Sequence, residues 1–370
     1  MSAADWAFRA HRLSLAKWLM AQGAVVGVVC PPGENRGILK RAGLEVFEMG
    51  WSREKISIWD TWKAARELGR IAHQFDADVI HCVSIRCILM GWLAGWSWEG
   101  RPWRVVNHVI GMGSVYSDTL KTLKGHGMKR LVSMALGRAF RSDATINVFQ
   151  NEDDLAFWKK RTDLPSTVWA KIPGSITWEN HDVSERDSGA FRIIYVGRML
   201  VDKGVGELHQ AWRKLIETDP SVELVLCGDV DPGNPNSLTR ERMRAWAREP
   251  GLHWLGRRSD VIDKMKAAHL VVLPSYREGM PKVILEAGMA GRAVVTTNVP
   301  GCREVVNDDE TGLLVPARNA DALYRAILKL KRNPQLRQRL AKGLHTRVQE
   351  SFTDDRVHPR WGNLYREVIG

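Results

Sequence analysis

The sequence predicts an α/β protein made of two Rossmann-like, doubly wound parallel-sheet domains. Short apolar runs with the length of buried strands alternate with segments of helical periodicity along the chain. This alternation is typical of parallel sheets covered by helices on both faces. With 370 residues, the chain is long enough for two domains of ordinary size. A polar stretch follows Pro173 and Gly174, and we place one domain over 1–172 and the second over 173–352, followed by a C-terminal helical segment over 353–370.

The first domain shows the expected alternation but not the expected beginning. Helical patterns cover 6–22, 59–75, 84–96 and 129–140, and strand patterns cover 24–30, 78–82, 103–108 and 144–149. A Rossmann-like domain should open with a strand and a Gly-rich turn, yet here a helix begins almost at Met1. We therefore expect that the first strand is missing, over about 10 to 15 residues. The sheet would then lack its central strand, and the site would lack one wall.

The second domain follows the regular pattern throughout. Strands are predicted over 191–196, 222–227, 253–255, 270–273, 293–297 and 312–315. Helices are predicted over 204–217, after Pro281, over 320–331 and over 334–351, and the last segment, 354–369, has helical character. This order of elements indicates a second parallel sheet with helices on both faces.

Composition indicates a globular protein of the cytoplasm. Hydrophobic residues make up 44% and charged residues 26% of the chain. No apolar run approaches the roughly 18 residues of a membrane-spanning helix, and the first residues lack the basic and apolar blocks of a secretion signal. The cysteines are odd in number and scattered, which favours reduced thiols over disulfides or a zinc site: Cys30, Cys82, Cys87, Cys227 and Cys302.

The positive charge is concentrated in the first domain. The net charge is +12, and residues 1–172 contain 24 Lys and Arg against 16 Asp and Glu, together with 11 of the 16 Trp. In the stretch 119–141, basic residues alternate with apolar ones, as in segments that lie on an anionic membrane. The residues that we expect to face such a membrane are Lys121, Lys124, Lys129 and Arg130. The alternative is a solvated helix face beside a core stripe. Because no nucleic-acid-binding motif is present, we expect a membrane surface and no nucleic acid as the anionic partner.

An anion-binding turn is predicted after the buried strand 270–273. Gly279 lets the backbone approach a ligand, and Pro281 suits the first position of the helix that follows. Two carboxylates, Glu278 and Glu286, frame this turn eight positions apart. The loop after strand 191–196 supplies Arg198 and Lys203 to the same sheet edge. An ordinary strand–turn–helix unit with solvated loop charges is the alternative.

These segments resemble glycosyltransferase family 4, retaining enzymes with the two-domain GT-B fold. Residues 278–286 are similar to its E-x(7)-E motif, and residues 197–204 to its G-R-x(4)-K-G motif. The resemblance implies that Arg198 and Lys203 bind the donor diphosphate and stabilise its developing charge. It also implies that Glu278 lies beside the transferred sugar and Glu286 holds the ribose. The other donor-binding candidates are Gly197, Gly279, Met280, Pro281 and Val283.

Two further segments are similar to the family. Residues 253–258 resemble its loop for the nucleotide base, which implies a role for the backbone of Gly256 and Arg257; an ordinary turn is the alternative. Residues 106–114 resemble the family's strand-to-loop segment on the acceptor side. The candidates for acceptor-side residues in this segment are Asn107, His108, Gly111 and Gly113. Many members have a His directly before the first Gly, where this chain has Ile110. His108 lies two residues earlier on the same strand face, and a structural His is the alternative.

The D-x-D pair at Asp229 and Asp231 has the form of a metal site in the other common glycosyltransferase fold. Here it precedes a turn-rich loop and has no further acidic residue nearby in the sequence. The resemblance implies catalysis without a metal, with Arg198 and Lys203 in its place. We therefore expect no metal and no cofactor.

The resemblance is to bacterial enzymes that build capsule, O-antigen or lipid-linked glycans. It implies retaining transfer of a hexose or N-acetylhexosamine from a UDP-sugar to a polyprenyl-diphosphate-linked saccharide. The enzyme would act from the cytoplasmic face of the inner membrane, and its C-terminal helix would cross back to the first domain. Two alternatives stay open: a catalytically impaired nucleotide-sugar-binding assembly partner, which the missing strand motivates, and a GT-B UDP-sugar epimerase.

Overall fold

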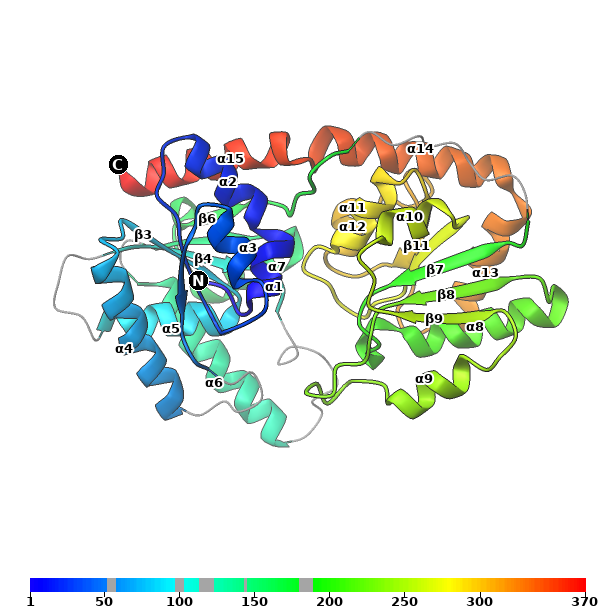
Figure 1. Cartoon of the computed structure of the whole chain (residues 1–370), viewed down its shortest axis with the longest axis horizontal. Helices are drawn as coiled ribbons and strands as arrows, with labels where there is room; N and C mark the ends of the chain where they lie inside the picture. Colours follow the sequence, from blue (N-terminus) through cyan, green and yellow to red (C-terminus); the bar gives the residue numbers. More distant parts are fainter. Residues whose placement is uncertain (52–57, 97–102, 113–122, 143–144, 180–188) are drawn as a thin grey trace. The chain divides into compact units, whose positions relative to one another are not determined.

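The computed structural model describes residues 1–51, 58–96, 103–112, 123–142, 145–179 and 189–370. The chain divides into two compact units, each with its own parallel sheets (Figure 1). Unit 1 comprises Met1–Gly174 and Asp354–Gly370, and unit 2 comprises Ser175–Thr353. Within the described residues, no helix is long and apolar enough to cross a lipid bilayer.

Unit 2 is built on one six-stranded parallel sheet. From edge to edge, its strands are β12 (Leu313–Val315), β11 (Ala293–Thr297), β10 (Leu270–Leu273), β7 (Arg192–Val196), β8 (Glu223–Cys227) and β9 (Leu252–Gly256). All residues of β10 and β11 are buried, as expected for short apolar runs in the centre of a parallel sheet. The chain runs outward from β7 in one direction and from β10 in the other. The switch point of the sheet therefore lies between these two strands.

Helices cover both faces of this sheet. They are α8 (Val205–Thr218), α9 (Arg240–Trp246), α10 (Val261–Lys266), α11 (Lys282–Met289), α12 (Cys302–Val305), α13 (Ala320–Arg332) and α14 (Pro334–Ser351), with a 3-10 turn, η3 (Val201–Lys203). Helix α8 packs against α13, and α11 packs against α14. Asn333 ends α13 and caps α14, since its side chain accepts a hydrogen bond from the Leu336 amide and Pro334 takes the first helical position.

Unit 1 contains two separate parallel sheets among its described residues. The larger has the order β3 (Val79–Val83), β4 (Arg104–Val109), β5 (Thr145–Phe149) and β6 (Trp169–Lys171), and the smaller pairs β1 (Gly27–Cys30) with β2 (Glu45–Glu48). Its helices are α1 (Asp5–His11), α2 (Leu13–Ala21), α3 (Arg36–Arg41), α4 (Ile58–Gln74), α5 (Ile85–Trp96), α6 (Leu123–Phe140), α7 (Glu152–Thr162) and α15 (Asp354–Ile369), with the turn η2 (Ser166–Val168). The single helix predicted over 6–22 is two helices, α1 and α2, which break at Arg12.

The last helix completes the core of unit 1. In α15, Trp361 is buried, and the Tyr365 hydroxyl lies 2.6 Å from Nδ1 of His81 on β3. The His81 ring stacks on that of His108 with ring centres 5.2 Å apart, and Trp361 packs against both rings. The C-terminal residues therefore cover one face of the β3–β6 sheet.

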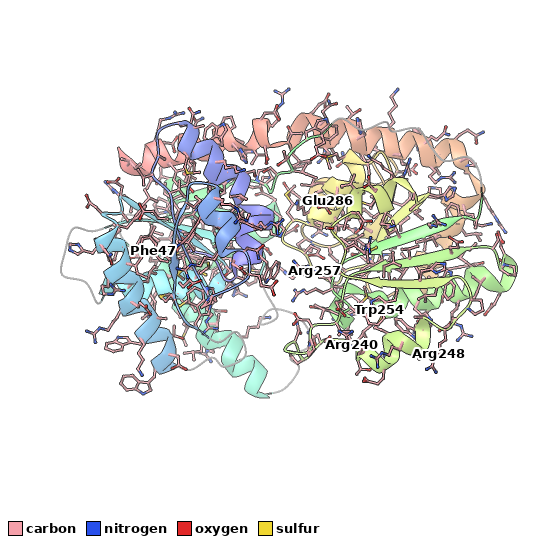
Figure 2. The ribbon with its side chains drawn as sticks, viewed as in Figure 1. Phe47, Arg240, Arg248, Trp254, Arg257 and Glu286 are labelled. Carbon is pink, nitrogen blue, oxygen red and sulfur yellow. The ribbon has the colours of Figure 1, made fainter. Side chains whose placement is uncertain are left out.

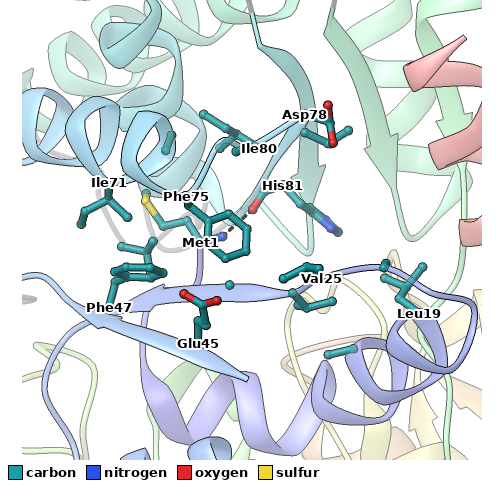
Figure 3. Close-up of a pocket in the computed structure, with 18 of the residues that line it drawn as sticks. Met1, Leu19, Val25, Glu45, Phe47, Ile71, Phe75, Asp78, Ile80 and His81 are labelled. Carbon is teal, nitrogen blue, oxygen red and sulfur yellow. Dashed lines mark hydrogen bonds between the residues drawn. The ribbon is translucent and has the colours of Figure 1, made fainter. Parts of the chain in front are cut away.

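The first residues of the chain lie in the space between the two sheets of unit 1. The Met1 nitrogen donates to the His81 carbonyl on β3, and the Ser2 amide donates to the Val29 carbonyl on β1. β1 and β3 belong to different sheets, and a cavity of about 730 Å³ is lined by residues of both strands (Figure 3).

Candidate functional site

The candidate site is formed by the loops that follow β7 and β10 at the switch point of unit 2. Gly204 has a left-handed backbone with φ of +68°, and a Cβ at this position would lie 2.1 Å from the Pro274 carbonyl oxygen. The Tyr276 amide donates to the Asp202 carbonyl at 2.9 Å. The two loops are therefore packed backbone to backbone, which only glycine at position 204 allows.

An ion pair joins these two loops. Nζ of Lys203 lies 2.5 Å from Oε1 of Glu278, and the two side chains are 21% and 13% exposed. Lys203 ends the short turn η3, and the Glu278 amide donates to the Pro300 carbonyl. The structure thus brings together two residues that the sequence analysis assigned to the same edge. Limited access of water strengthens the attraction between these charges.

A third loop, after β11, also reaches this place. Gly301 has φ of +82°, and a Cβ there would lie 2.5 Å from the Gly279 carbonyl oxygen. The sequence analysis did not predict this approach. A glycine directly after Pro300 was the available signal, because Gly is the usual residue where a tight turn needs a positive φ. Gly301 therefore shapes the turn that holds Gly279.

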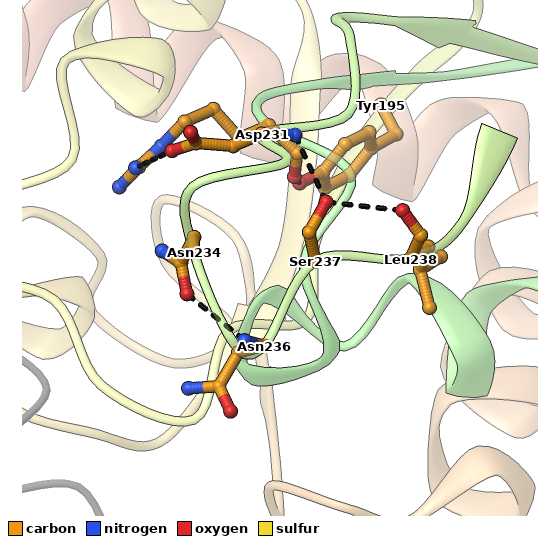
Figure 4. A network of polar contacts seen from close by, with 7 residues as sticks. Tyr195, Asp231, Asn234, Asn236, Ser237 and Leu238 are labelled. Carbon is orange, nitrogen blue, oxygen red and sulfur yellow. Dashed lines mark hydrogen bonds and ion pairs between the residues drawn. The ribbon is translucent and has the colours of Figure 1, made fainter. Parts of the chain in front are cut away.

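Arg198 is held at the same edge by the loop after β8. Its Nη1 donates to Oδ2 of Asp231 at 2.7 Å, and the two side chains are 45% and 29% exposed. The Asp231 amide in turn donates to the Ser237 hydroxyl, which donates to the Leu238 carbonyl (Figure 4). The Tyr195 hydroxyl donates to the Arg198 carbonyl and fixes its backbone. The guanidinium is thus positioned from two sides while remaining accessible.

Both carboxylates of the D-x-D pair contact arginines. Asp229 accepts from Nη2 of Arg240 at 3.1 Å, and Asp231 accepts from Arg198. Across the described residues, no group of three or more His, Cys, Asp or Glu side chains is arranged to hold a metal ion. In this arrangement the pair orders basic side chains around the loop after β8.

The start of α11 faces the same sheet edge. The sequence analysis placed Pro281 at the first position of this helix. In the structure the helix begins one residue later, at Lys282, and Pro281 is its N-cap. The dipole of a helix makes its N-terminal end favourable for an anion. Gly279 is buried, while Met280 and Val283 are partly buried and pack against the core of unit 2.

Glu286 lies within α11 and is only 20% exposed as a side chain. Nζ of Lys282 lies 3.5 Å from its Oε1, one helical turn away. Burial raises the pKa of the Glu286 carboxyl, and Lys282 opposes this shift. The carboxylate can accept hydrogen bonds from ligand hydroxyl groups where it is ionised.

The end of β9 adds an exposed loop at the neighbouring strand. Gly256 has φ of +63°, and its carbonyl accepts from the Gly228 amide at 2.7 Å. Trp254 donates through Nε1 to the Gly228 carbonyl, and the Arg240 guanidinium lies 5.7 Å from the centre of its ring (Figure 2). Arg257 is exposed. The loops after β8 and β9 are therefore tied together by their backbones.

The acceptor-side candidates lie in unit 1, mostly within its core. Asn107 is buried and donates to Oδ1 of Asn147 at 3.0 Å. His108 is fully buried, and burial together with nearby Arg12 holds its pKa well below the usual range. The structural alternative for His108 is therefore the one that this structure favours. Gly111 follows β4 with φ of +144°, and Gly113 lies outside the described residues.

The membrane-facing candidates lie on or before α6. Lys129 and Arg130 are exposed, next to Leu131 and Met134, whose exposed fractions are 54% and 47%. Lys121 and the side chain of Lys124 lie outside the described part of the structure. The helix also sends Leu136 and Phe140 into the core. Its outer surface thus combines basic and apolar side chains.

Comparison with known proteins identifies both units. Residues 176–345 match the family model described as glycosyl transferases group 1, and residues 9–149 match that of a glycosyl transferase 4-like domain. The chain is 25% identical over 376 residues to the N,N'-diacetylbacillosaminyl-diphospho-undecaprenol α-1,3-N-acetylgalactosaminyltransferase of Campylobacter jejuni, which covers 97% of this chain and 95% of that protein. It is 29% identical over 179 residues to the capsular polysaccharide biosynthesis glycosyltransferase CapM of Staphylococcus aureus, and this alignment covers 48% of this chain and 47% of CapM.

Solved structures of low sequence identity share the fold. HepE of Anabaena, in complex with UDP and glucose, matches with a TM-score of 0.76 and 17% identity over 96% of this chain and 94% of HepE. Sucrose-phosphate synthase of Thermosynechococcus elongatus matches with a TM-score of 0.77 and 20% identity over 96% of this chain and 92% of that one. The chain is therefore a glycosyltransferase of the GT-B fold, with a group 1 domain over 176–345 and a glycosyl transferase 4-like domain over 9–149.

Proposed function

We propose that this glycosyltransferase moves a hexose or N-acetylhexosamine from a UDP-sugar to a polyprenyl-diphosphate-linked saccharide, with retention of configuration. The observation that carries the proposal is the contact of Lys203 with Glu278 between the loops after β7 and β10, beside the start of α11. A cation, a carboxylate and the N-terminal end of a helix at one edge suit a sugar diphosphate. Similarity along almost the whole chain to the Campylobacter jejuni enzyme, named for a diphospho-undecaprenol acceptor, supports the acceptor class.

Charge on the leaving diphosphate is the main demand of the reaction. As the bond from sugar to phosphate breaks, negative charge grows on the UDP oxygens, and fixed cations lower the energy of that state. Lys203 is held in place by Glu278, and Arg198 exchanges Asp231 for a phosphate oxygen when the donor binds. These two cations act without a metal or other cofactor. The first amides of α11 add further donors.

The carboxylates and the β9 loop position the rest of the donor. Glu286 accepts hydrogen bonds from the ribose hydroxyls, and Glu278 lies beside the transferred sugar. Gly197 and Gly279 have no side chain beyond the backbone, which lets the backbone at this edge approach the diphosphate closely. The backbone of Gly256 and Arg257 contacts the uracil base, supported by the exposure of this loop.

The acceptor brings the enzyme to the membrane. A polyprenyl chain stays in the bilayer, so the protein must bind at its cytoplasmic face. The exposed surface of α6 supports this location, because Lys129 and Arg130 suit anionic headgroups while Leu131 and Met134 suit the boundary with the acyl chains.

The test uses the purified full chain. UDP-glucose, UDP-galactose and their N-acetylamino forms are compared with GDP-mannose by thermal shift, because a ligand of the native state raises the melting temperature. The stabilising donor, radiolabelled, is then incubated with undecaprenyl-diphosphate-linked saccharides, with and without EDTA. We expect EDTA-resistant label in the lipid fraction. Stabilisation by no UDP-sugar, or label released only as free epimerised sugar, would contradict the proposal.

A second candidate function is binding of the UDP-sugar without transfer, as an assembly partner. The separation of the β1–β2 and β3–β6 sheets in unit 1 favours it, because two separate small sheets give the acceptor side weaker support than one continuous sheet. It predicts thermal stabilisation by a UDP-sugar together with no labelled lipid, even at high enzyme concentration. Any multiple-turnover transfer would exclude this candidate.

A further inference from the structure

Tyr276 links the two loops of the candidate site through its side chain. It is partly buried and lies in the loop after β10, two residues before Glu278. Its hydroxyl donates to Oε1 of Glu207 at 2.5 Å. Glu207 lies in the first turn of α8, the helix that begins directly after η3 and Gly204. The bond therefore joins the segment that carries Glu278 to the segment that carries Lys203.

This contact lies beside two others between the same segments. The Tyr276 amide donates to the Asp202 carbonyl at 2.9 Å. The following residue, Lys203, pairs with Glu278. A bond from a hydroxyl to a carboxylate is stronger than most, because the acceptor is charged. Glu207 also lies at the N-terminal end of α8, where the helix dipole stabilises a negative charge. Tyr276 thus adds two contacts to the junction that the ion pair makes.

The Tyr276 ring has a cationic neighbour from a third loop. The guanidinium of Arg318, in the loop after β12, lies 4.6 Å from the centre of the ring, within the range of a cation–π contact. Arg318 has a left-handed backbone with φ of +59°, which is uncommon for a residue other than glycine. Burial and the bond to Glu207 raise the pKa of the Tyr276 hydroxyl, so it stays protonated and remains a donor. Loops from three strands therefore meet at this side chain.

The contacts of Tyr276 differ from the ion pair in one respect that matters for the reaction. In the proposed function, Lys203 binds the donor diphosphate, so its ammonium group shares or exchanges its contact with Glu278. The ion pair then fastens the two loops less firmly. Neither the hydroxyl of Tyr276 nor the carboxylate of Glu207 is assigned to the donor. Their bond therefore persists while Lys203 changes partners.

We propose that Tyr276 is a positioning residue of the donor site. Its hydrogen bond to Glu207 holds the loop after β10 in register with η3, so that Lys203 keeps its place while its contact passes from Glu278 to the diphosphate. This inference rests on the proposed function, because Tyr276 acts through the donor-binding role of Lys203. Precise placement matters, since a shift of about 1 Å in a catalytic group lowers turnover by up to about 10²-fold.

The test removes the hydroxyl and keeps the ring. Tyr276→Phe retains the ring that Arg318 contacts, and Tyr324→Phe on α13 is the matched control, since it makes the same change in unit 2. We expect Tyr276→Phe to lower kcat for sugar transfer by about tenfold, with the KM for the UDP-sugar within about twofold. The Kd for UDP, measured by calorimetry, should rise by about fivefold, because UDP carries the full charge of the leaving group. Tyr324→Phe should leave both kcat and this Kd unchanged.

Changes at the other end of the bond separate its geometry from its charge. Glu207→Gln keeps an oxygen that accepts from the hydroxyl, whereas Glu207→Ala removes the acceptor. We expect the Gln variant to keep kcat and the Kd for UDP within about twofold of the unchanged chain, and the Ala variant to match Tyr276→Phe. The double variant with Tyr276→Phe and Glu207→Ala should lose at most about twofold beyond either single change, because both break one contact. The two Glu207 variants decide the question alone should Tyr276→Phe fail to fold.

Urea unfolding of every variant identifies a merely structural contact, whose loss would lower stability and leave the kinetics of the folded enzyme unchanged. Normal kcat and normal UDP affinity in Tyr276→Phe would overturn the proposal, whatever its stability. Equal losses in Glu207→Gln and Glu207→Ala would also overturn it, because the charge of Glu207 and not its hydrogen bond would then be responsible. If the unchanged chain labels no lipid, the proposed acceptor is refuted, while the UDP affinities still decide the role of Tyr276.

Discussion

Lys203→Met would remove one ammonium group from the candidate site while keeping most of the side-chain volume. Fixed donors that stabilise charge in a transition state contribute about 10²- to 10³-fold to turnover, or about 2.7–4 kcal/mol. The variant also leaves Glu278, 13% exposed, without its cation. Breaking a fully buried pair costs about 3–5 kcal/mol. Because water reaches both partners here, we expect a loss of about 1–3 kcal/mol in the free energy of unfolding.

A double variant separates these two effects. In Lys203→Met with Glu278→Gln, no charge is left without a partner, so unfolding in urea should return toward that of the unchanged chain. Initial rates of sugar transfer should stay low, because the cation that faces the diphosphate is still absent. Lys214→Met is the matched control, since Lys214 pairs with Asp321 at the surface of the same unit. Recovery of turnover together with stability in the double variant would refute a catalytic role for Lys203.

Four other variants probe the remaining parts of the protein. Arg198→Ala should lower turnover by about 10²- to 10³-fold with little change in the urea midpoint, and near-normal initial rates would remove Arg198 from the catalytic residues. Glu286→Gln should weaken UDP-sugar binding, measured by calorimetry. Burial raises the pKa of Glu286, so the affinity of the unchanged chain should also fall as the pH is lowered and the carboxylate is protonated. The Gln variant should lack this pH dependence. Gly204→Ala should lower the free energy of unfolding by about 1–3 kcal/mol, because φ at this position is +68° and the new Cβ would meet the Pro274 carbonyl. Gly206→Ala is the control, since a Cβ there meets nothing within 4 Å. Equal unfolding curves for the two variants would refute the argument. Lys129→Glu with Arg130→Glu should reduce cosedimentation with phosphatidylglycerol vesicles, most strongly at low salt, and unchanged binding would exclude α6 as the membrane contact.

The fold class follows from the sequence because buried parallel strands are short apolar runs. β10 and β11 begin and end at the predicted residues, since each run is entirely buried. β2 was missed because its sequence, Glu-Val-Phe-Glu, is only partly buried and short. Helix α7 was also missed, although Asn151 before three acidic residues is an N-terminal capping pattern, and its side chain accepts from the Asp154 amide.

Tertiary contacts explain the other differences. The periodicity of residues 6–22 is continuous, but the helix breaks at Arg12, whose guanidinium is partly buried beside His108. Strand alternation places His108 on a face without telling what covers that face. The covering residues, Trp361 and Tyr365, come from the far end of the chain. No local pattern contains this information.

At the candidate site, the sequence predicts the edge but not the contacts. Parallel topology brings the ends of β7 and β10 together, so Arg198, Lys203 and Glu278 were expected near one another. Which carboxylate faces which cation depends on loop conformation. Lys203 pairs with Glu278, while Arg198 pairs with Asp231, a residue first considered as a metal ligand.

The contact between Arg198 and Asp231 bears on how fast the enzyme can finish a catalytic cycle. Arg198 and Lys203 each contact a carboxylate of the chain itself, so the charges of these two cations are largely balanced within the protein. In the proposed reaction, a diphosphate that binds Arg198 competes with Asp231 for the same guanidinium. After the proposed transfer, the contact with Asp231 would offset part of the attraction that holds UDP. The internal carboxylate would thereby lower product inhibition, at the cost of weaker binding of the donor.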